Sequence, residues 1–162
     1  MAIKRLKNIL VMYFMVMVTF FSYFEIGYAY QQHPILLKTN IEKQWDCLSR
    51  NAYFEARNQP TKGIVAIVYV TLNRAVSEHR RACSEVYEKG QFGWVGMHYR
   101  IHDNASWIRI KGIVWNVIHN YKPKYDPTHG ATYYCGIHEH PHWRYRFRRT
   151  VKIKDHVFFR SV

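Results

Sequence analysis

The sequence predicts an α+β domain that is mainly helical and ends in a small antiparallel sheet. Segments 44–57 and 61–77 have the length and composition of helices, and a third apolar stripe begins near residue 104. After the turn-forming prolines and glycine of 123–130, apolar and polar residues alternate, as they do in strands. The 162 residues suffice for one domain, and 48% apolar residues exclude a wholly disordered chain.

The first two helices are predicted from different signals. In 44–57, one face carries Leu48, Asn51, Ala52 and Glu55 by the i, i+3, i+4, i+7 rule, which turns Glu55 inward. Pro60 ends this helix or opens the next. Segment 61–77 contains β-branched residues that a buried strand also uses, but its length favours a core helix.

The remaining elements follow from glycines and periodicity. Residues 84–104 have three glycines and little periodicity, so we expect a loop. An amphipathic helix follows, with Asn104 or Ser106 as its N-cap and a stripe of Trp107, Ile110, Val114, Val117, Ile118 and Tyr121. The tail predicts two or three antiparallel strands, from 143–147, 151–153 and 156–159.

The N-terminus reads as an export signal. Lys4, Arg5 and Lys7 precede an apolar run at 9–24, and Gly27-Tyr28-Ala29 approximates a cleavage site. We therefore expect a signal peptide at 1–29, a lead-in segment at 30–43, and export to the periplasm or the extracellular space. An uncleaved signal-anchor in the inner membrane, through residues 9–24, is the alternative, although a membrane span needs about 20 residues.

The composition indicates the kind of partner. Lys and Arg number 24 against 11 Asp and Glu, a net charge of +13 that attracts polyanions. The export signal favours the anionic cell envelope over nucleic acid. A chain with 17% aromatic residues also suits a groove that binds sugar rings.

Three cysteines, Cys47, Cys83 and Cys135, are expected to leave one unpaired in an oxidising compartment. We predict a Cys47–Cys83 disulfide because both residues flank the apolar segment 64–72. Closing such a loop stabilises a fold by about 3–4 kcal/mol. Cys135 is then either buried or free to pair between chains.

Five motifs resemble those of the SleB/CwlJ cell wall hydrolase family. Asn51–Arg57 is similar to its N-x-Y-x-E-A-R, and Val70–Arg74 to its V-x-L-N-R. Gln91-Phe92-Gly93-Trp94, Asp126–Tyr134 and Ile153–Phe159 resemble its Q-F-S-W, D-P-T-x-G-A-x-x-Y/F and I-G-x-H-x-F-Y. The motifs occur in the family order, so we expect residues 44–162 to form a SleB-like catalytic domain.

The resemblance implies a lysozyme-like or lytic-transglycosylase-like enzyme that cuts between N-acetylmuramic acid and N-acetylglucosamine in peptidoglycan glycan strands, acting as a monomer without a cofactor. It also implies Glu55 as the catalytic acid. Glycoside cleavage needs a carboxylic acid that keeps its proton near neutral pH, and desolvation raises a carboxyl pKa. A salt bridge from Glu55 to Arg57 or Arg74 is the alternative without catalysis.

Several further residues are expected to bind substrate. Aromatic side chains for stacking on sugar rings are Phe92, Trp94, Tyr133 and Tyr134, although core packing is the competing role. Gln91 suits an acetamido group, Arg57 adjoins the acid, and His156 occupies a matched family position where it could hold Glu55, bind substrate or serve packing.

One position departs from the family pattern. Many relatives follow E-A-R with Gly-Glu-Pro, whereas this chain has Asn58-Gln59-Pro60. Gln59 cannot act as a base, which favours single-acid transglycosylation, in which the substrate's own 6-hydroxyl attacks. Asp126 and Asp103 are fallback carboxylates, each with a competing role as a cap or turn residue.

The segment His138-Glu-His-Pro-His142 could present three imidazoles on one face, as a zinc site does. Pro141 argues for an exposed loop instead, and we expect no metal. The adjacent arginines suggest an envelope-binding or solvated basic face: Arg144, Arg146, Arg148 and Arg149. The alternative function is a catalytically inactive or membrane-anchored cell-wall-binding lysis protein.

Overall fold

The structure is a computed structural model that describes residues 41–161 together with Met12, Met15 and Met17. The three methionines are helical and exposed. The expected signal peptide, the apolar run at 9–24 and nearly all of the lead-in segment fall outside the described residues. Within the described part of the chain, no helix is long and apolar enough to cross a membrane.

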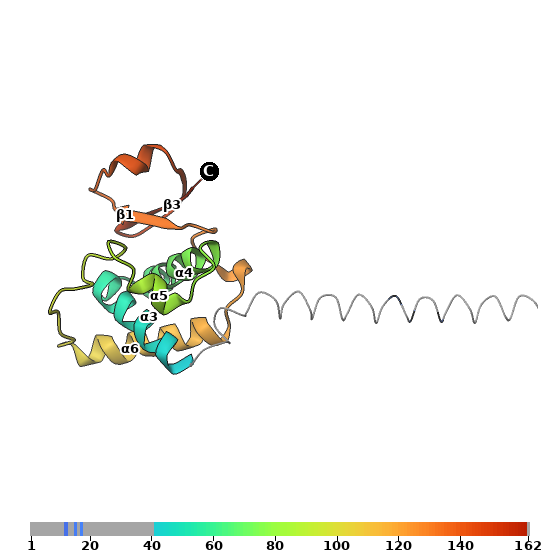
Figure 1. Cartoon of the computed structure of the whole chain (residues 1–162), viewed down its shortest axis with the longest axis horizontal. Coiled ribbons are helices and arrows are strands. Elements are labelled where there is room, and N and C mark those ends of the chain that lie inside the picture. Colours follow the sequence, from blue (N-terminus) through green and yellow to red (C-terminus); the bar gives the residue numbers. More distant parts are fainter. Residues whose placement is uncertain (1–11, 13–14, 16, 18–40, 162) are drawn as a thin grey trace, which may run out of the picture. The chain divides into compact units, whose positions relative to one another are not determined.

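Four helices form the larger layer of the domain. They are α3 (Ile41–Ala56), α4 (Thr61–Ser77), the short α5 (Ala82–Val86) and α6 (Asn104–His119). Helix α3 packs against the other three, and α4 also contacts α5 and α6. Figure 1 shows this arrangement, with the sheet lying on the side of α4. The core therefore forms around α3 and α4.

The helix predictions are largely confirmed. Leu48, Asn51 and Ala52 are buried on α3, and most of α4 is buried, which explains its near-continuous apolar sequence. Pro60 is the N-cap of α4, where its fixed φ of −62° is compatible with helix entry. Residues 84–104 form the expected loop except where α5 extends to Val86.

The stripe on α6 is also confirmed, but its cap is not. Ile110, Val114 and Ile118 are buried in the core. The N-cap is Asp103, whose carboxylate accepts a hydrogen bond from the Ser106 N–H at 3.0 Å, so the expectation of Asn104 or Ser106 was wrong. Asn, Asp and Ser are all good caps, and their clustering leaves the choice to backbone geometry.

The C-terminal sheet has three antiparallel strands in the order β1-β3-β2. They are β1 (Tyr133–Gly136), β2 (Arg148–Ile153) and β3 (His156–Arg160). The prediction of strands over 151–153 and 156–159 is confirmed. A strand at 143–147 was wrong, because most of that segment is the 3-10 helix η2 (His142–Tyr145), which follows Pro141. A further 3-10 turn, η1, spans Pro123–Tyr125.

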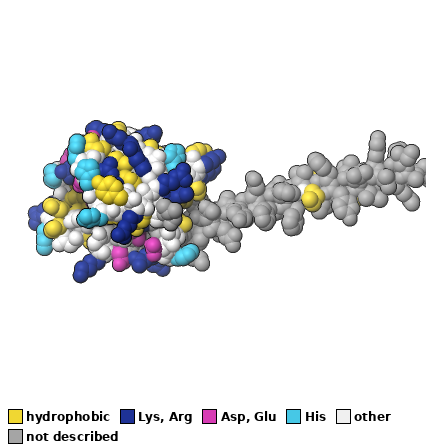
Figure 2. Space-filling view, turned by 90° about the horizontal axis from the view of Figure 1, so that it is seen from above, with side chains coloured by type: hydrophobic (Ala, Val, Ile, Leu, Met, Phe, Trp, Pro, Cys, Tyr) yellow, Lys and Arg dark blue, Asp and Glu magenta, His cyan; other side chains and the backbone are white. Residues whose placement is uncertain are grey.

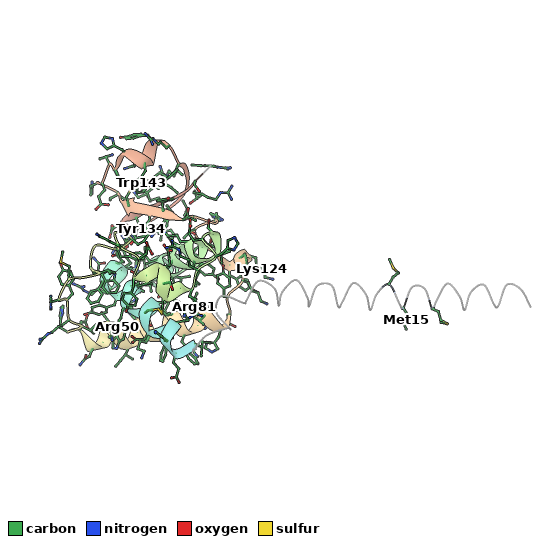
Figure 3. The ribbon with its side chains drawn as sticks, in the orientation of Figure 1. Met15, Arg50, Arg81, Lys124, Tyr134 and Trp143 are labelled. Carbon is green, nitrogen blue, oxygen red and sulfur yellow. A yellow bond between two sulfur atoms is a disulfide. The ribbon has the colours of Figure 1, made fainter. Side chains whose placement is uncertain are left out.

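The strand β1 separates two apolar clusters. Tyr134 packs with the main core, whereas Tyr133 and Cys135 belong to a small cluster with Trp143, Phe147 and Phe159. Figure 3 shows Tyr134 on the side of the sheet near the helices and Trp143 on the other side. The alternation of side chains along a strand produces this division.

The predicted Cys47–Cys83 disulfide is present and joins α3 to α5. The amide N–H of Cys83 also donates to Gln44 Oε1 at 2.9 Å, so two interactions hold α5 against α3. Cys135 is buried and has no disulfide partner. A disulfide of this kind is typical of proteins that fold in an oxidising compartment.

Candidate active site

Glu55 lies in the last turn of α3, where that helix approaches the sheet. Its side chain is half-buried, and its Oε2 accepts a hydrogen bond of 2.6 Å from the hydroxyl of Tyr134 on β1. The two residues are 79 positions apart in the chain. Contact between the helical layer and the sheet therefore creates the environment of the predicted acid.

Burial raises the pKa of Glu55 above its ordinary value of 4.5. The hydrogen bond from Tyr134 and the positive charge of Arg74 oppose this change, and the negative charge of Glu139 adds to it. Desolvation is the largest of these influences, so the carboxyl group holds its proton to a higher pH than an exposed glutamate does. A general acid for glycoside cleavage needs this property.

Glu55 opens into a cavity of about 550 Å³. The walls come from the end of α3 and the turn after it, from the loop between β1 and η2, and from the turn between β2 and β3. Most of the lining residues are polar, and the full set is Phe54, Glu55, Arg57, Asn58, Gln59, Gly136, Ile137, His138, Glu139, Asp155 and His156. A cavity lined by such residues, beside a carboxyl group with a raised pKa, suits a substrate rich in hydroxyl and amide groups.

Burial shifts the pKa of both Tyr134 and His156 beside the acid. Burial raises the pKa of Tyr134 well above 10, so its hydroxyl remains a hydrogen-bond donor to Glu55. Burial lowers the pKa of His156, which favours the neutral form of its ring. The His156 ring meets the Tyr134 ring edge-on at 5.3 Å, and its buried Nδ1 has no hydrogen-bond partner among the described residues.

Neither arginine forms the alternative salt bridge. In residues 41–161 no ion pair within 4.0 Å joins Glu55 to Arg57 or Arg74. Arg57 is exposed, lines the cavity, and places its guanidinium 5.3 Å from the centre of the Tyr53 ring. Arg74 donates to the carbonyl of Thr132, and it acts on Glu55 only through its charge.

None of the four expected stacking residues lines this cavity. Phe92 is buried with 4% of its surface exposed and lies under the guanidinium of Arg74, so the prediction that it stacks on a sugar was wrong. Trp94 is half-buried, stacks on Phe54 at 4.8 Å, and donates its indole N–H to Asn51. The glycines near Trp94 suggested that it lies in a cleft, but its indole ring does not line the cavity of Glu55.

Gln91 and Tyr133 lie at a second cavity of about 310 Å³, also lined by Arg74, Glu85 and Thr132. Arg74 Nη1 donates to Gln91 Oε1 at 3.1 Å, and its guanidinium lies 5.5 Å from the Tyr133 ring centre. The predicted site residues therefore divide between two cavities. Glu55, Arg57 and His156 line the first, whereas Tyr134 does not line it and is hydrogen-bonded to Glu55.

The fallback carboxylates are both structural. Asp126 accepts hydrogen bonds from the Thr128 and Gly130 amides and from the Asn73 side chain, which fixes the turn before β1. Asp103 caps α6. Neither lines the cavity that contains Glu55.

The structure brings other polar residues to the acid that sequence reasoning missed. Glu139 and Asp155 line its cavity, as does His138. Gln59 is buried and donates to Asp155 Oδ2 at 3.0 Å, which is a structural role. Asp155 lies within the last of the five family-like motifs, and this position in the sequence could have identified it as a site residue. For Glu139 the histidines around it suggested only a metal.

The described residues contain no group of three or more His, Cys, Asp or Glu side chains that could hold a metal ion. In the 138–142 segment, His138 lines the cavity of Glu55, while His140 contacts Arg144. His142 begins η2. Three imidazoles could share one face only if the segment were extended. The turn at 137–138 and the start of η2 interrupt it.

A family model described as Cell Wall Hydrolase matches residues 58–159. The chain belongs to the cell wall hydrolase family. The match covers most of the domain and begins just after Glu55, so it confirms the resemblance without testing that residue. No curated protein matches the chain.

Two solved structures share the fold. The catalytic domain of the Bacillus cereus SleB protein aligns with a TM-score of 0.59 and 23% identity, over 74% of this chain and 91% of that one. The catalytic domain of the germination-specific lytic transglycosylase SleB from Bacillus anthracis aligns with a TM-score of 0.59 and 24% identity, over 72% and 93%. The predicted α+β fold is thereby confirmed.

Proposed function

We propose that this cell wall hydrolase is an exported lytic transglycosylase that cleaves the bond between N-acetylmuramic acid and N-acetylglucosamine in peptidoglycan. The observation that carries the proposal is the Glu55 carboxyl group, with its raised pKa, hydrogen-bonded by Tyr134 at a polar cavity. The lytic transglycosylase that shares the fold supports the reaction class.

Glu55 performs both proton transfers in this mechanism. Its carboxyl proton passes to the glycosidic oxygen as the bond between that oxygen and C1 of the muramic acid breaks. The resulting carboxylate then takes the proton of the C6 hydroxyl, whose oxygen forms the new bond to C1 and closes a 1,6-anhydro ring. Tyr134 keeps its donor on Glu55 throughout, which holds the carboxyl group in one orientation and stabilises its anionic form.

Substrate binding is assigned to both cavities. Arg57 and His156 contact the sugars beside Glu55, and Gln91 and Tyr133 extend the binding surface along the second cavity. Trp94 contributes the part of its ring that stays exposed.

Attraction to the anionic envelope is assigned to exposed basic residues of the sheet. Figure 2 shows Lys and Arg side chains across the face seen from above, with hydrophobic and histidine side chains among them. The exposed basic residues of the sheet are Arg148, Arg149, Lys152 and Arg160. The disulfide supports an oxidising compartment, and the protein needs no cofactor.

Mass spectrometry of digested sacculi tests the proposal. We expect the purified protein to release muropeptides with 1,6-anhydro ends, and we expect Glu55→Gln to release none while unfolding at the wild-type temperature. An inactive wall-binding protein would bind sacculi and release nothing in either form. That outcome would reject the enzyme and support the alternative function.

A further inference from the structure

Two other carboxylates, Asp155 and Glu139, line the cavity of Glu55, and they differ in the number of polar groups that contact them. Asp155 accepts a hydrogen bond from Gln59 at 3.0 Å and lies 3.8 Å from the ammonium group of Lys154. Glu139 accepts one bond, from the Gly136 N–H to Oε2 at 2.8 Å. No hydrogen bond engages its Oε1 within residues 41–161, and its side chain is exposed to the cavity.

The loop between β1 and η2 holds Glu139 in this place. Its amide N–H donates to the Gly136 carbonyl at 3.0 Å, and its own carbonyl accepts from Arg144 Nη1 at 2.6 Å. The carboxyl group occupies space that any side chain at position 136 would need, because a Cβ there would lie 3.2 Å from Glu139 Cδ. Glycine at 136 thus allows the glutamate to fold back over the end of β1.

The charge of Glu139 reaches the groups around the acid. It contributes to the raised pKa of Glu55 and of Tyr134, and it opposes the lowering of the His156 pKa. The positive charge of Arg74 acts on Glu55 in the opposite sense. A carboxylate that lines the same cavity as Glu55 and has an oxygen without a hydrogen bond can accept a proton from a water bound there.

We propose that Glu139 is a second catalytic carboxylate, a general base that directs water to the anomeric carbon and gives this enzyme a hydrolytic branch. The inference rests on the proposed glycosidase function. Pairs of carboxylic acids that flank a scissile bond commonly divide the work in this way, one as acid and the other as base. Gln59 cannot supply the base, since it lacks a carboxylate and is bound to Asp155.

The hydrolytic step balances with these two groups and one water. Glu55 gives its proton to the leaving glycosidic oxygen as the bond from that oxygen to C1 breaks. The water oxygen forms the new bond to C1, and Glu139 takes one water proton. Glu139 then releases that proton to solvent while Glu55 regains one, and the product has a reducing end in place of a 1,6-anhydro ring.

Digestion of sacculi in water enriched in oxygen-18 separates the two branches. We expect the full-length wild type to give both 1,6-anhydro ends and reducing ends that carry the label. Glu139→Gln should lower the labelled fraction by about tenfold or more, the usual contribution of a general base, while anhydro products persist. Glu42→Gln, an exposed glutamate in the first turn of α3, is the matched control and should leave the ratio unchanged.

Gly136→Ala provides a second variant that keeps the charge. The added Cβ shifts the Glu139 carboxyl group, so the labelled fraction should fall by less than in Glu139→Gln. Removing the charge of Glu139 should also move the alkaline limb of the remaining activity to lower pH, because that charge raises the pKa of Glu55. Thermal unfolding confirms that each variant is folded.

The outcomes separate the inference from the function on which it rests. An unchanged ratio of labelled to anhydro ends in Glu139→Gln would reject the base, as would a wild type that gives only anhydro ends. Glycosidase function would survive both results. A wild type that releases no muropeptides of either kind would instead reject the proposed function.

Discussion

Glu55 and Glu85 are two carboxyl groups whose pKa values are both raised but whose surroundings differ. Burial is the main cause of the raised pKa of both, and Arg74 opposes it in both. Glu55 is half-buried, bonded to Tyr134, and open to a cavity of about 550 Å³. Glu85 is 1% exposed, and neither of its oxygens has a hydrogen-bond partner in the described part of the chain.

The comparison shows that a raised pKa does not by itself make a catalytic acid. A useful acid also needs a fixed orientation and access to substrate, and Tyr134 and the cavity provide these for Glu55. The pKa of Glu85 is also raised, but no hydrogen-bond donor among the described residues fixes its orientation, so its substitution should change stability more than activity. Substitutions at the two sites should therefore affect different measurements.

The largest expected effect is on activity. Glu55→Gln should reduce the rate of sacculus digestion by about a thousandfold, since general acid–base catalysis contributes roughly 10²–10⁴. The free energy of unfolding at pH 7 should not fall, because the amide removes a partly desolvated charge. Dye release from labelled sacculi measures the rate, with Glu42→Gln as the control. Wild-type clearance by the variant would show that Glu55 is not the acid.

The disulfide holds the α5 region of Glu85 against the α3 helix of Glu55. Replacing Cys47 and Cys83 together by alanine should lower the free energy of unfolding by about 3–4 kcal/mol, from the chain entropy released in the unfolded state. Denaturant unfolding measures the change, and the wild type under reducing conditions should show the same loss. A loss well below 1 kcal/mol would mean that the packing of α5 is sufficient without the disulfide.

The hydrogen bond from Tyr134 distinguishes Glu55 from Glu85, so its removal is the next test. Tyr134→Phe should lower activity about tenfold, in line with roughly 1.5 kcal/mol for a hydrogen bond to a charged group. That bond lowers the pKa of Glu55, so its loss should move the alkaline limb of the pH–rate profile upward. A downward movement of the limb would contradict the assignment of Glu55 as the titrating acid.

The smallest effect is expected at Glu85, where the sign depends on pH. A carboxyl group with a raised folded-state pKa binds more protons in the folded state, so its stabilising contribution is complete below the unfolded pKa and is lost as the pH rises. Glu85→Gln should thus raise the free energy of unfolding by about 1 kcal/mol at pH 7, where the buried charge is costly.

The same variant should give no gain at pH 4, because the wild-type carboxyl group is already protonated there. Thermal unfolding of the wild type and Glu85→Gln at both pH values measures the difference in stability. An equal gain at the two pH values would attribute the effect to packing, and a loss at pH 7 would identify Glu85 as a needed counter-charge for Arg74.

Much of the helical half could be predicted because its signals are local. The face of α3, the apolar length of α4 and the stripe of α6 are periodic within one segment. The short strand β1 was missed because four residues contain too little alternation to identify a strand. The 3-10 helix η2 was read as a strand because its aromatic residues alternate, although the geometry after Pro141 turns the chain.

The sequence by itself predicted the family, the three longer helices, the disulfide and a candidate for the acid. Tertiary structure alone decided which residues surround that acid. Tyr134 and Glu139 reach Glu55 from β1 and the loop after it, and Phe92 enters the core. Periodicity records which face of an element is apolar, whereas the burial and charge that set a pKa depend on segments that only folding brings together.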